Sequence, residues 1–355
     1  MQTIRELFEE ISSNRRRWSY YSNPNISIRG VWEDSDGDAA LNFIKRYFSL
    51  ANKSGVFRDK QLCRKESYIK ARSNHIISTF LLGIKIAESF NIDCDIRSDE
   101  GFNFKYYWFL SCLYHDIGYA YEKNRRERQL SMIRVDGLDA LQQICDIKYL
   151  DDRVFQSLTR EQVDIYLKGR ATSRCGYQAV IDHGIVGGLL IYDRLRKQYE
   201  ESWKNRTNTS DERTSFYVNT ADGRRLHLSD RHYDAYAYVA DAIIRHNVFN
   251  DTLKIYMNEL QLCDRYCFDR KISIVSNVLG FVLGIADTIE PSKRGIKYID
   301  EVKIEELQTE PGIRLLVTDK IYNKLYSNID SLSDWLCVNV EVTAKEGEMV
   351  IEIKN

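Results

Sequence analysis

The chain has 355 residues, with 51 lysines and arginines against 52 aspartates and glutamates, so its formal net charge is −1. This balance gives no overall attraction to nucleic acid or to a membrane surface, and no apolar stretch reaches the length that crosses a bilayer. Eight cysteines are scattered without a paired framework, as expected for reduced thiols in a cytoplasmic protein. The length is sufficient for one large core and a smaller appendage.

The first residues predict an amphipathic helix. Ile4, Leu7, Phe8 and Ile11 recur at helical spacing within residues 1–17, and the glutamates among them argue against a targeting peptide. We assign residues 1–70 to an N-terminal helical extension.

Residues 71–296 predict a helical core. Apolar side chains recur at helical spacing in four stripes, and a fifth apolar run, residues 108–113, leads into the pair His115-Asp116. The stripes cover residues 76–87, 181–195, 236–244 and 275–286. Each stripe lies beside, or contains, one further histidine or aspartate: His75, His183, His246 or Asp287. A helix bundle builds a metal site in this way, from polar side chains that several helices point inward.

Two charged insertions interrupt this core, at about residues 122–176 and 200–233. In the second, Asp222-Gly223 stands between short β-prone runs and predicts a hairpin.

In the tail, residues 297–355, apolar side chains change to a two-residue period. It predicts strands near residues 302–304, 313–317, 338–342 and 349–353, with a helix over residues 319–336. The fold class is therefore mainly α, with a small α+β C-terminal domain.

Four of the six histidines belong to one ordered series with two aspartates: His75, His115-Asp116, His183, His246 and Asp287. Imidazoles and carboxylates together are the groups that a divalent transition metal binds. Burying an imidazole and a carboxylate at the end of an apolar helix is costly unless a metal ion or hydrogen bonds compensate. A lone histidine on an apolar face is more often a hydrogen-bonded core residue. For His183 and His246, this structural role is the alternative to metal binding.

The ordered series resembles the HD-domain superfamily of metal-dependent phosphohydrolases, over about residues 71–294. The resemblance implies an HD-type helical bundle in which His75, His115, Asp116 and Asp287 hold one ion. His183 and His246 resemble the extra ligands of the two-metal form, in which Asp116 bridges both ions. That form is found in cyclic-dinucleotide phosphodiesterases and in a small group of di-iron oxygenases.

Two such ions lower the pKa of a shared water from 15.7 to about 7, so that hydroxide is available at neutral pH to attack phosphorus. Histidine-rich ligand sets favour Mn, Fe, Co, Ni or Zn, with Mg as a further candidate. We therefore expect a phosphohydrolase acting on a nucleotide, either a cyclic (di)nucleotide phosphodiesterase or a (deoxy)nucleoside triphosphate hydrolase. The alternatives are a di-iron oxygenase, a metal-dependent nuclease on single-stranded nucleic acid, and a binding module without activity.

Three cations are candidates for gripping an anionic substrate beside the catalytic Asp116. Arg72 lies one helical turn before His75, and Lys293 and Arg294 follow Asp287 closely. Lysines and arginines at such positions are more often solvated or paired on the surface, which is the alternative for all three residues.

The chain departs from the triphosphohydrolases of the superfamily at Tyr119, where they typically have another histidine. The predicted partner is a nucleotide or other phosphate ester, with no membrane. The insertions and the tail are candidate surfaces for self-association.

Overall fold

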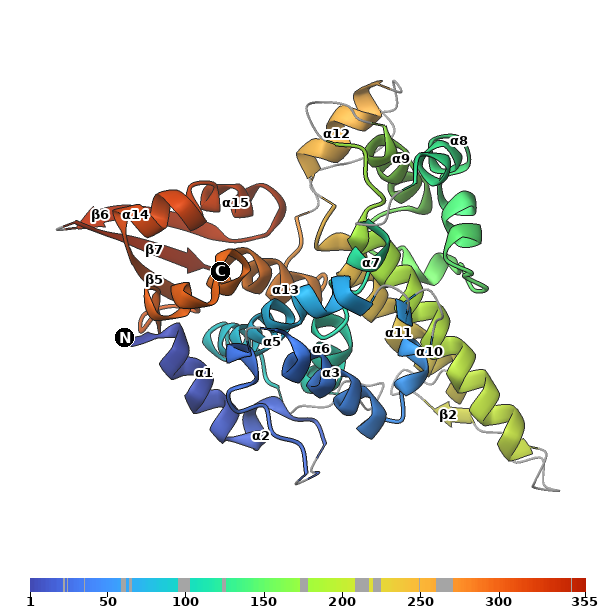
Figure 1. The fold of residues 1–355 in the computed structure, drawn as a ribbon, viewed down its shortest axis with the longest axis horizontal. Coiled ribbons are helices and arrows are strands. Elements are labelled where there is room, and N and C mark those ends of the chain that lie inside the picture. Colours follow the sequence, from blue (N-terminus) through green and yellow to red (C-terminus); the bar gives the residue numbers. More distant parts are fainter. Residues whose placement is uncertain are drawn as a thin grey trace.

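The computed structural model describes residues 1–355 except 22, 24, 35, 59–61, 64–65, 95–102, 123–125, 173–177, 208–216, 220–224, 249, 260–270 and 346. The fold is mainly α, with a small antiparallel sheet built largely from the C-terminal residues, as the sequence predicts (Figure 1). None of the helices in the described part of the chain is both long and apolar enough to cross a membrane.

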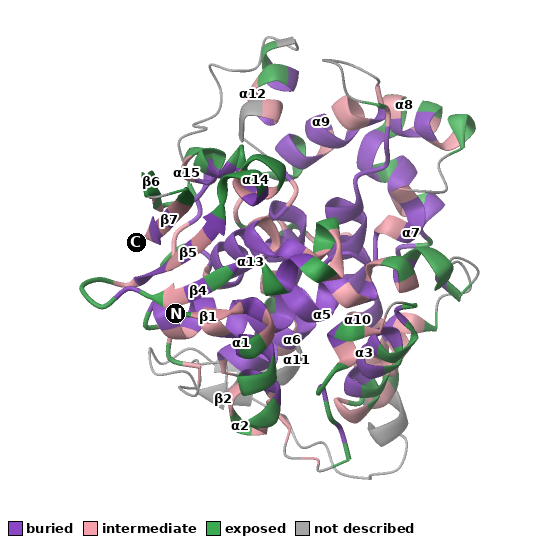
Figure 2. Ribbon diagram, turned by 60° about the vertical axis from the view of Figure 1, so that its left-hand side comes forward, coloured by how far each residue is buried: buried purple, intermediate pink, exposed green. Residues whose placement is uncertain are grey.

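Five helices build the core. They are α5 (Glu66–Ser89), α6 (Phe104–Cys112), α10 (His183–Thr207), α11 (Leu228–Arg245) and α13 (Val278–Ile289). All nine residues of α6 are buried, and most of α5 and α13 is buried as well (Figure 2). A helix that is apolar on every side is stable only inside a protein, which is why these segments lie at the centre.

The pairing of α10 with α11 depends on close approach. A side chain at Gly188 would meet the backbone oxygen of Ala240 and the side chain of Ile244, each at 2.6 Å. The glycines that follow His183 thus bring the helix carrying one predicted ligand against the helix that leads to another.

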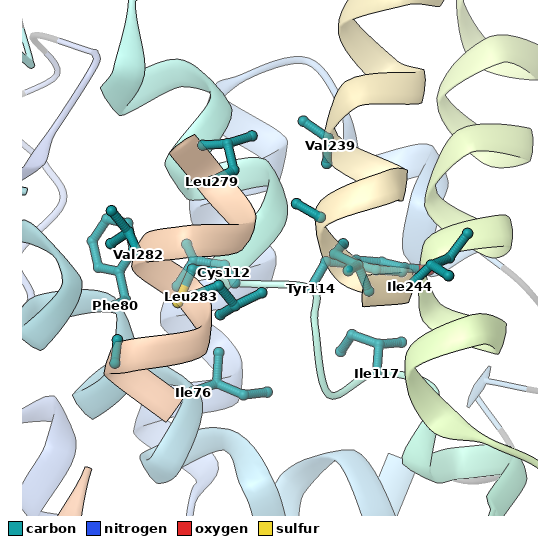
Figure 3. Close-up of a cluster of buried hydrophobic side chains, with 14 of the residues drawn as sticks. Ile76, Phe80, Cys112, Tyr114, Ile117, Val239, Ile244, Leu279, Val282 and Leu283 are labelled. Atoms are coloured by element: carbon teal, nitrogen blue, oxygen red, sulfur yellow. The ribbon is translucent and has the colours of Figure 1, made fainter. Parts of the chain in front are cut away.

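Apolar side chains close to the predicted ligands pack into one cluster between the core elements (Figure 3). The cluster includes Ile76 of α5, Tyr114 and Ile117 of the turn after α6, Ile244 of α11 and Leu283 of α13. The ligand-bearing segments are therefore fixed by packing that does not involve a metal ion.

Further helices surround the core (Figure 1). The first insertion contains α8 and α9, which pack against each other, and α12 contacts α9. The hairpin predicted in the second insertion is present as β2 and β3, paired antiparallel, while its Asp222-Gly223 turn lies outside the described residues. These helices and strands are α1 (Ile4–Ser13), α2 (Arg15–Trp18), α3 (Asp38–Leu50), α7 (Tyr119–Glu122), α8 (Glu127–Ile144), α9 (Arg160–Ala171), α12 (Asn250–Glu259), β2 (Tyr217–Asn219) and β3 (Arg225–His227).

The C-terminal sheet has five antiparallel strands in the order β1-β4-β5-β7-β6. Four of them match the predicted strands, and the fifth, β1, comes from the second and third residues of the chain. The strands are β1 (Gln2–Thr3), β4 (Lys303–Glu306), β5 (Gly312–Thr318), β6 (Asn339–Lys345) and β7 (Glu348–Lys354). β1 pairs with β4 of the sheet, and α1 contacts α5 of the core, so the N-terminal residues join both parts of the molecule. The divisions at residues 70 and 297 stay predictions.

Two local predictions were wrong. The continuous helix expected over residues 319–336 is interrupted at residues 327–328, where the backbone oxygen of Asn328 accepts both the N–H and the hydroxyl of Ser331. The pieces are α14 (Asp319–Ile321), η7 (Tyr322–Tyr326), η8 (Ile329–Ser331) and α15 (Leu332–Trp335). The stripe expected from Val275 begins only at Val278, because the Asn277 side chain caps α13 by accepting the N–H of Gly280. Val275 is 96% exposed in the preceding turn.

Candidate metal centre

The structure brings all six residues of the histidine-aspartate series together. His75 lies within α5, His183 is the first residue of α10, and Asp287 lies near the end of α13. His115 and Asp116 follow the last turn of α6, and His246 follows the end of α11. The four histidines and Asp116 are buried, and only Asp287 is partly exposed, with 18% of its side chain accessible.

Asp116 lies between two groups of histidines. Its Oδ1 is 3.5 Å from Nε2 of His115 and 3.5 Å from Nε2 of His183, and its Oδ2 is 3.6 Å from Nε2 of His75. His75, His115 and Asp116 form one group whose ligand atoms lie within 4.8 Å of one another, and Asp116, His183 and His246 form a second. Because both groups contain Asp116, the arrangement matches a carboxylate shared by two ions.

Asp287 belongs with the first group. Its Oδ1 is 2.8 Å from Nε2 of His75 and 3.7 Å from Nε2 of His115. Ligand atoms about 2.0–2.2 Å from one ion lie roughly 3–3.6 Å apart at octahedral or tetrahedral angles. The separations around Asp116 and Asp287 are therefore close to those of a coordination shell.

Each histidine uses its other ring nitrogen, Nδ1, to donate a hydrogen bond to an oxygen of the chain. Glu290 accepts from His75 at 2.7 Å, and Glu122 accepts from His183 at 2.6 Å. His115 and His246 donate to the backbone oxygens of the residues three positions earlier, at 2.7 and 2.5 Å. With a proton on Nδ1, the neutral ring keeps a lone pair on Nε2 for a metal ion. In His75, His115 and His183 this atom lies 2.8–3.5 Å from a carboxylate oxygen of Asp116 or Asp287. All four rings are thus oriented as metal ligands.

Nε2 of His115 supports the fit to a metal most directly. The ring is fully buried, and this nitrogen makes no hydrogen bond with the residues that the structure describes. Buried polar nitrogens are rarely left without a partner. A divalent ion shared with Asp116 and Asp287 satisfies the nitrogen, so the residues present fit such an ion.

The electrostatics of the site follow from the same contacts. Burial alone would raise the pKa of Asp116, but the neighbouring histidines and Arg72 hold it well below its ordinary value. Burial likewise opposes a low pKa at Asp287, and Lys293 with the histidines lowers it. Both aspartates are therefore carboxylates at neutral pH, as metal ligands must be.

The pKa of His246 is shifted in the opposite direction to the pKa values of His75 and His183. Burial, together with the neighbouring His115 and His183, lowers the pKa of His246 to about 3, so His246 is neutral. Burial also opposes protonation of His75 and His183, but their carboxylate partners raise both pKa values above the ordinary value. His75 has a carboxylate oxygen at each ring nitrogen, so an ion that binds its Nε2 must displace a proton.

Two of the three predicted cations lie at the centre. Nε and Nη2 of Arg72 lie 2.9 and 2.8 Å from Oδ2 of Asp116, and Nζ of Lys293 lies 3.1 and 3.0 Å from the two oxygens of Asp287. Arg294 is exposed and makes no ion pair with the described residues. The side chains of Arg72 and Lys293 are 21% and 30% exposed, whereas His115 is inaccessible. These two cations therefore lie on the side of the centre that solvent reaches, which is its open side.

Tyr119, the point of departure from the triphosphohydrolase pattern, lies between two site residues. Its ring stacks on that of His183 with centroids 3.9 Å apart, and the Arg72 guanidinium lies 4.4 Å from its centroid. The tyrosine therefore supports one predicted ligand and one predicted anion-binding cation.

The backbone around the ligands is held by close contacts. A side chain at Gly118 would lie 1.9 Å from the backbone oxygen of His183, so the turn carrying His115 and Asp116 needs a glycine there. Asp182 accepts the N–H of Ile185 and the side-chain amide of Asn247, at 3.1 and 2.6 Å. This carboxylate joins the residue before His183 to the residue after His246.

Glu122 and Glu290, the two carboxylates that orient ligand histidines, were missed by sequence reasoning. Glu290 follows Asp287 by three residues and so lies one helical turn further along α13, which is a signal that could have found it. Glu122 follows Asp116 by six residues, and nothing in the local pattern distinguishes it from other glutamates.

Comparison of the chain with protein-family models, with curated proteins and with solved structures finds no match. The centre is therefore interpreted from its own geometry.

Proposed function

We propose that this protein is a metal-dependent phosphohydrolase of the HD type, which holds two divalent ions and acts on a phosphoester or phosphoanhydride bond of a nucleotide. One observation carries the proposal: four buried histidines, each with an oxygen acceptor at Nδ1, converge on two carboxylates. The HD-type assignment rests on the order of these residues along the chain and on their position in a helical bundle.

The ligand set divides naturally between two ions. His75, His115 and Asp287 would hold one, His183 and His246 the other, and Asp116 would bridge them. When bound, such ions supply a hydroxide at neutral pH and neutralise phosphoryl oxygens. The chain itself contributes the orientation of the rings, the ionised state of the two aspartates and the burial that excludes competing water.

Arg72 and Lys293 favour a phosphate ester over a neutral substrate. Both lie on the open side of the centre and within hydrogen-bond distance of the carboxylates. An anion that approaches the ions therefore meets two cations, whereas a neutral substrate gains nothing from them. This is the feature that ranks phosphate hydrolysis above the di-iron oxygenase, which would use a similar set of ligands.

The test begins with metal analysis of the purified protein, followed by chelation and reconstitution with Mn, Fe, Co, Ni, Zn or Mg. Each form is then assayed on cyclic mono- and dinucleotides, nucleoside triphosphates and single-stranded oligonucleotides. We expect metal-dependent hydrolysis of one nucleotide class, lost in Asp116→Ala. Full activity of chelated Asp116→Ala would refute the proposal, and iron-dependent oxygen consumption without hydrolysis would favour the oxygenase.

A further inference from the structure

The two carboxylates that would bind metal are already neutralised by cations of the chain. Arg72 contacts Asp116 through two nitrogens, at 2.9 and 2.8 Å, on the same oxygen that faces His75. Lys293 lies nearly equidistant from both oxygens of Asp287, at 3.1 and 3.0 Å, where it covers the edge of the carboxylate that a chelating ion would use. Metal ions and these cations therefore require the same oxygens.

We propose that Arg72 and Lys293 compete with the metal ions for Asp116 and Asp287, so that metal binding releases them to grip an anion. This inference rests on the proposed metal-dependent function and adds a coupling between its two ligands. Metal and phosphate would strengthen each other's binding, because the ions free the cations that the phosphate needs.

The physical reason is like-charge repulsion in a buried site. A guanidinium and a divalent ion on one carboxylate oxygen lie only a few ångströms apart, and repulsion at that distance is strong where water is excluded. A carboxylate that coordinates an ion is also a weaker acceptor. Both effects loosen the contacts of Arg72 and Lys293 when the ions bind.

The formal charge of the centre with two ions bound also favours an anionic ligand. Four carboxylates belong to it, namely Asp116, Asp287, Glu122 and Glu290, and they are opposed by Arg72 and Lys293. With neutral histidines these groups carry a formal charge of minus two, which two divalent ions convert to plus two. A hydroxide and a phosphate diester restore neutrality, and a neutral ligand does not.

Neither cation is needed to hold its helix in place. Lys293 follows Pro291 in the 3-10 turn η5 (Pro291–Arg294), whose backbone is held by Glu290. Arg72 is the seventh residue of the 24-residue helix α5, within continuous helical backbone. Both side chains can therefore leave their carboxylates without any change in the backbone that carries the ligands.

The experiment measures Mn²⁺ binding to the full chain by titration calorimetry, with and without inorganic phosphate. Arg72→Met and Lys293→Met should each tighten Mn²⁺ binding about tenfold in the absence of phosphate, because a competitor has been removed. Phosphate should tighten Mn²⁺ binding by the wild type roughly tenfold and by either variant much less. Circular dichroism verifies the fold, and Arg72→Gln replaces Arg72→Met if that variant does not fold.

Matched controls remove a partly exposed or an exposed cation from the same region. Lys70→Met, two residues before Arg72, loses an ion pair with Asp38, and Lys297→Met lies one turn beyond Lys293. Both should bind Mn²⁺ like the wild type. Unchanged or weaker Mn²⁺ binding in Arg72→Met and Lys293→Met would overturn the competition while leaving the proposed function intact. A wild type that binds no Mn²⁺, Fe²⁺ or Co²⁺ would overturn both.

Discussion

Glu290 and His75 are joined by a buried hydrogen bond of 2.7 Å, and the same carboxylate accepts the backbone N–H groups of Ser292 and Lys293. One side chain thus fixes the ring of a predicted ligand on α5 and the turn that carries a predicted anion-binding cation. Glu122 has the first of these roles for His183. The two glutamates orient one ring in each half of the centre.

Replacing either glutamate should weaken metal binding without removing a ligand. Glu290→Gln and Glu122→Gln remove the negative charge that orients the ring and makes Nε2 more basic, so each should lower Mn²⁺ affinity roughly tenfold to a hundredfold. Titration calorimetry measures the change. The control is Glu88→Gln on α5, which loses an ion pair with Arg17 of α2 and should bind Mn²⁺ normally. Wild-type affinity in both test variants would assign the glutamates a packing role only.

The number of bound ions should depend on which half of the centre is altered. His183→Ala or His246→Ala removes a ligand from one group only, so occupancy should fall by about one ion per chain. Asp116→Ala removes the shared carboxylate and should abolish binding of both ions, with the helical fold preserved. Elemental analysis of each purified variant gives the count. A single ion in the wild type that persists in His183→Ala and His246→Ala would make these histidines core residues.

Loss of the anion-binding cations should slow turnover. Charge-assisted hydrogen bonds contribute roughly 1.5–3 kcal/mol, so Arg72→Ala should lower kcat/KM about tenfold to a hundredfold at saturating metal. Lys293→Ala should account for most of the loss in a Lys293/Arg294 double variant, because Lys293 alone of the two contacts Asp287. Hydrolysis of the preferred nucleotide is the readout. Equal kcat/KM in the wild type and all these variants would show that these cations do not bind the substrate phosphate, and it would favour the oxygenase alternative.

Lys53 should destabilise the fold at neutral pH. Its ammonium donates to the hydroxyl of Tyr236 at 3.0 Å and lies over the rings of Tyr106 and Tyr236, and burial lowers its pKa to about 8. Because the pKa of Lys53 in the folded protein is below the ordinary value of 10.5, charging this amine opposes folding fully below pH 8 and ceases to do so above about pH 10.5. Stability from this residue therefore rises with pH across that window.

Lys53→Met consequently should raise the free energy of unfolding at pH 7, by roughly 1–3 kcal/mol, with a smaller gain at pH 10. Denaturant unfolding of variant and wild type at each pH measures the difference, so titrations common to both proteins cancel. Lys45→Met, at an exposed ion pair with Glu66, should change stability little. A gain of the same size at both pH values would show that the effect is packing rather than charge.

The sequence predicted the residues of the centre because histidine is scarce and each member of the series adjoins an apolar helical segment. It also predicted the four C-terminal strands, since their alternating pattern is local. It missed β1 because two residues, Gln2 and Thr3, carry no detectable period, and their pairing with Lys303 and Ile304 is decided by the fold.

Other features depend on contacts between distant segments and have no local signal. Glu122 resembles any surface glutamate until α7 places it against His183. Residues 319–336 have helical apolar spacing, yet Asn328 and Ser331 form local hydrogen bonds that interrupt the helix. A pattern of apolar residues predicts which side chains face the core. It does not predict where a polar side chain hydrogen-bonds to the backbone and ends a helix.

The pairing of β1 with β4 has a consequence for synthesis of the protein. Thr3 lies opposite Lys303, and the N–H of Ile4 donates to the backbone oxygen of Val302 at 2.9 Å. Thr3 and Lys303 are separated by 300 residues, so a ribosome that adds about 5–20 residues per second makes β4 roughly 15–60 s after β1. During that time β1 has no partner strand, and its docking on the sheet follows the synthesis of the helical core.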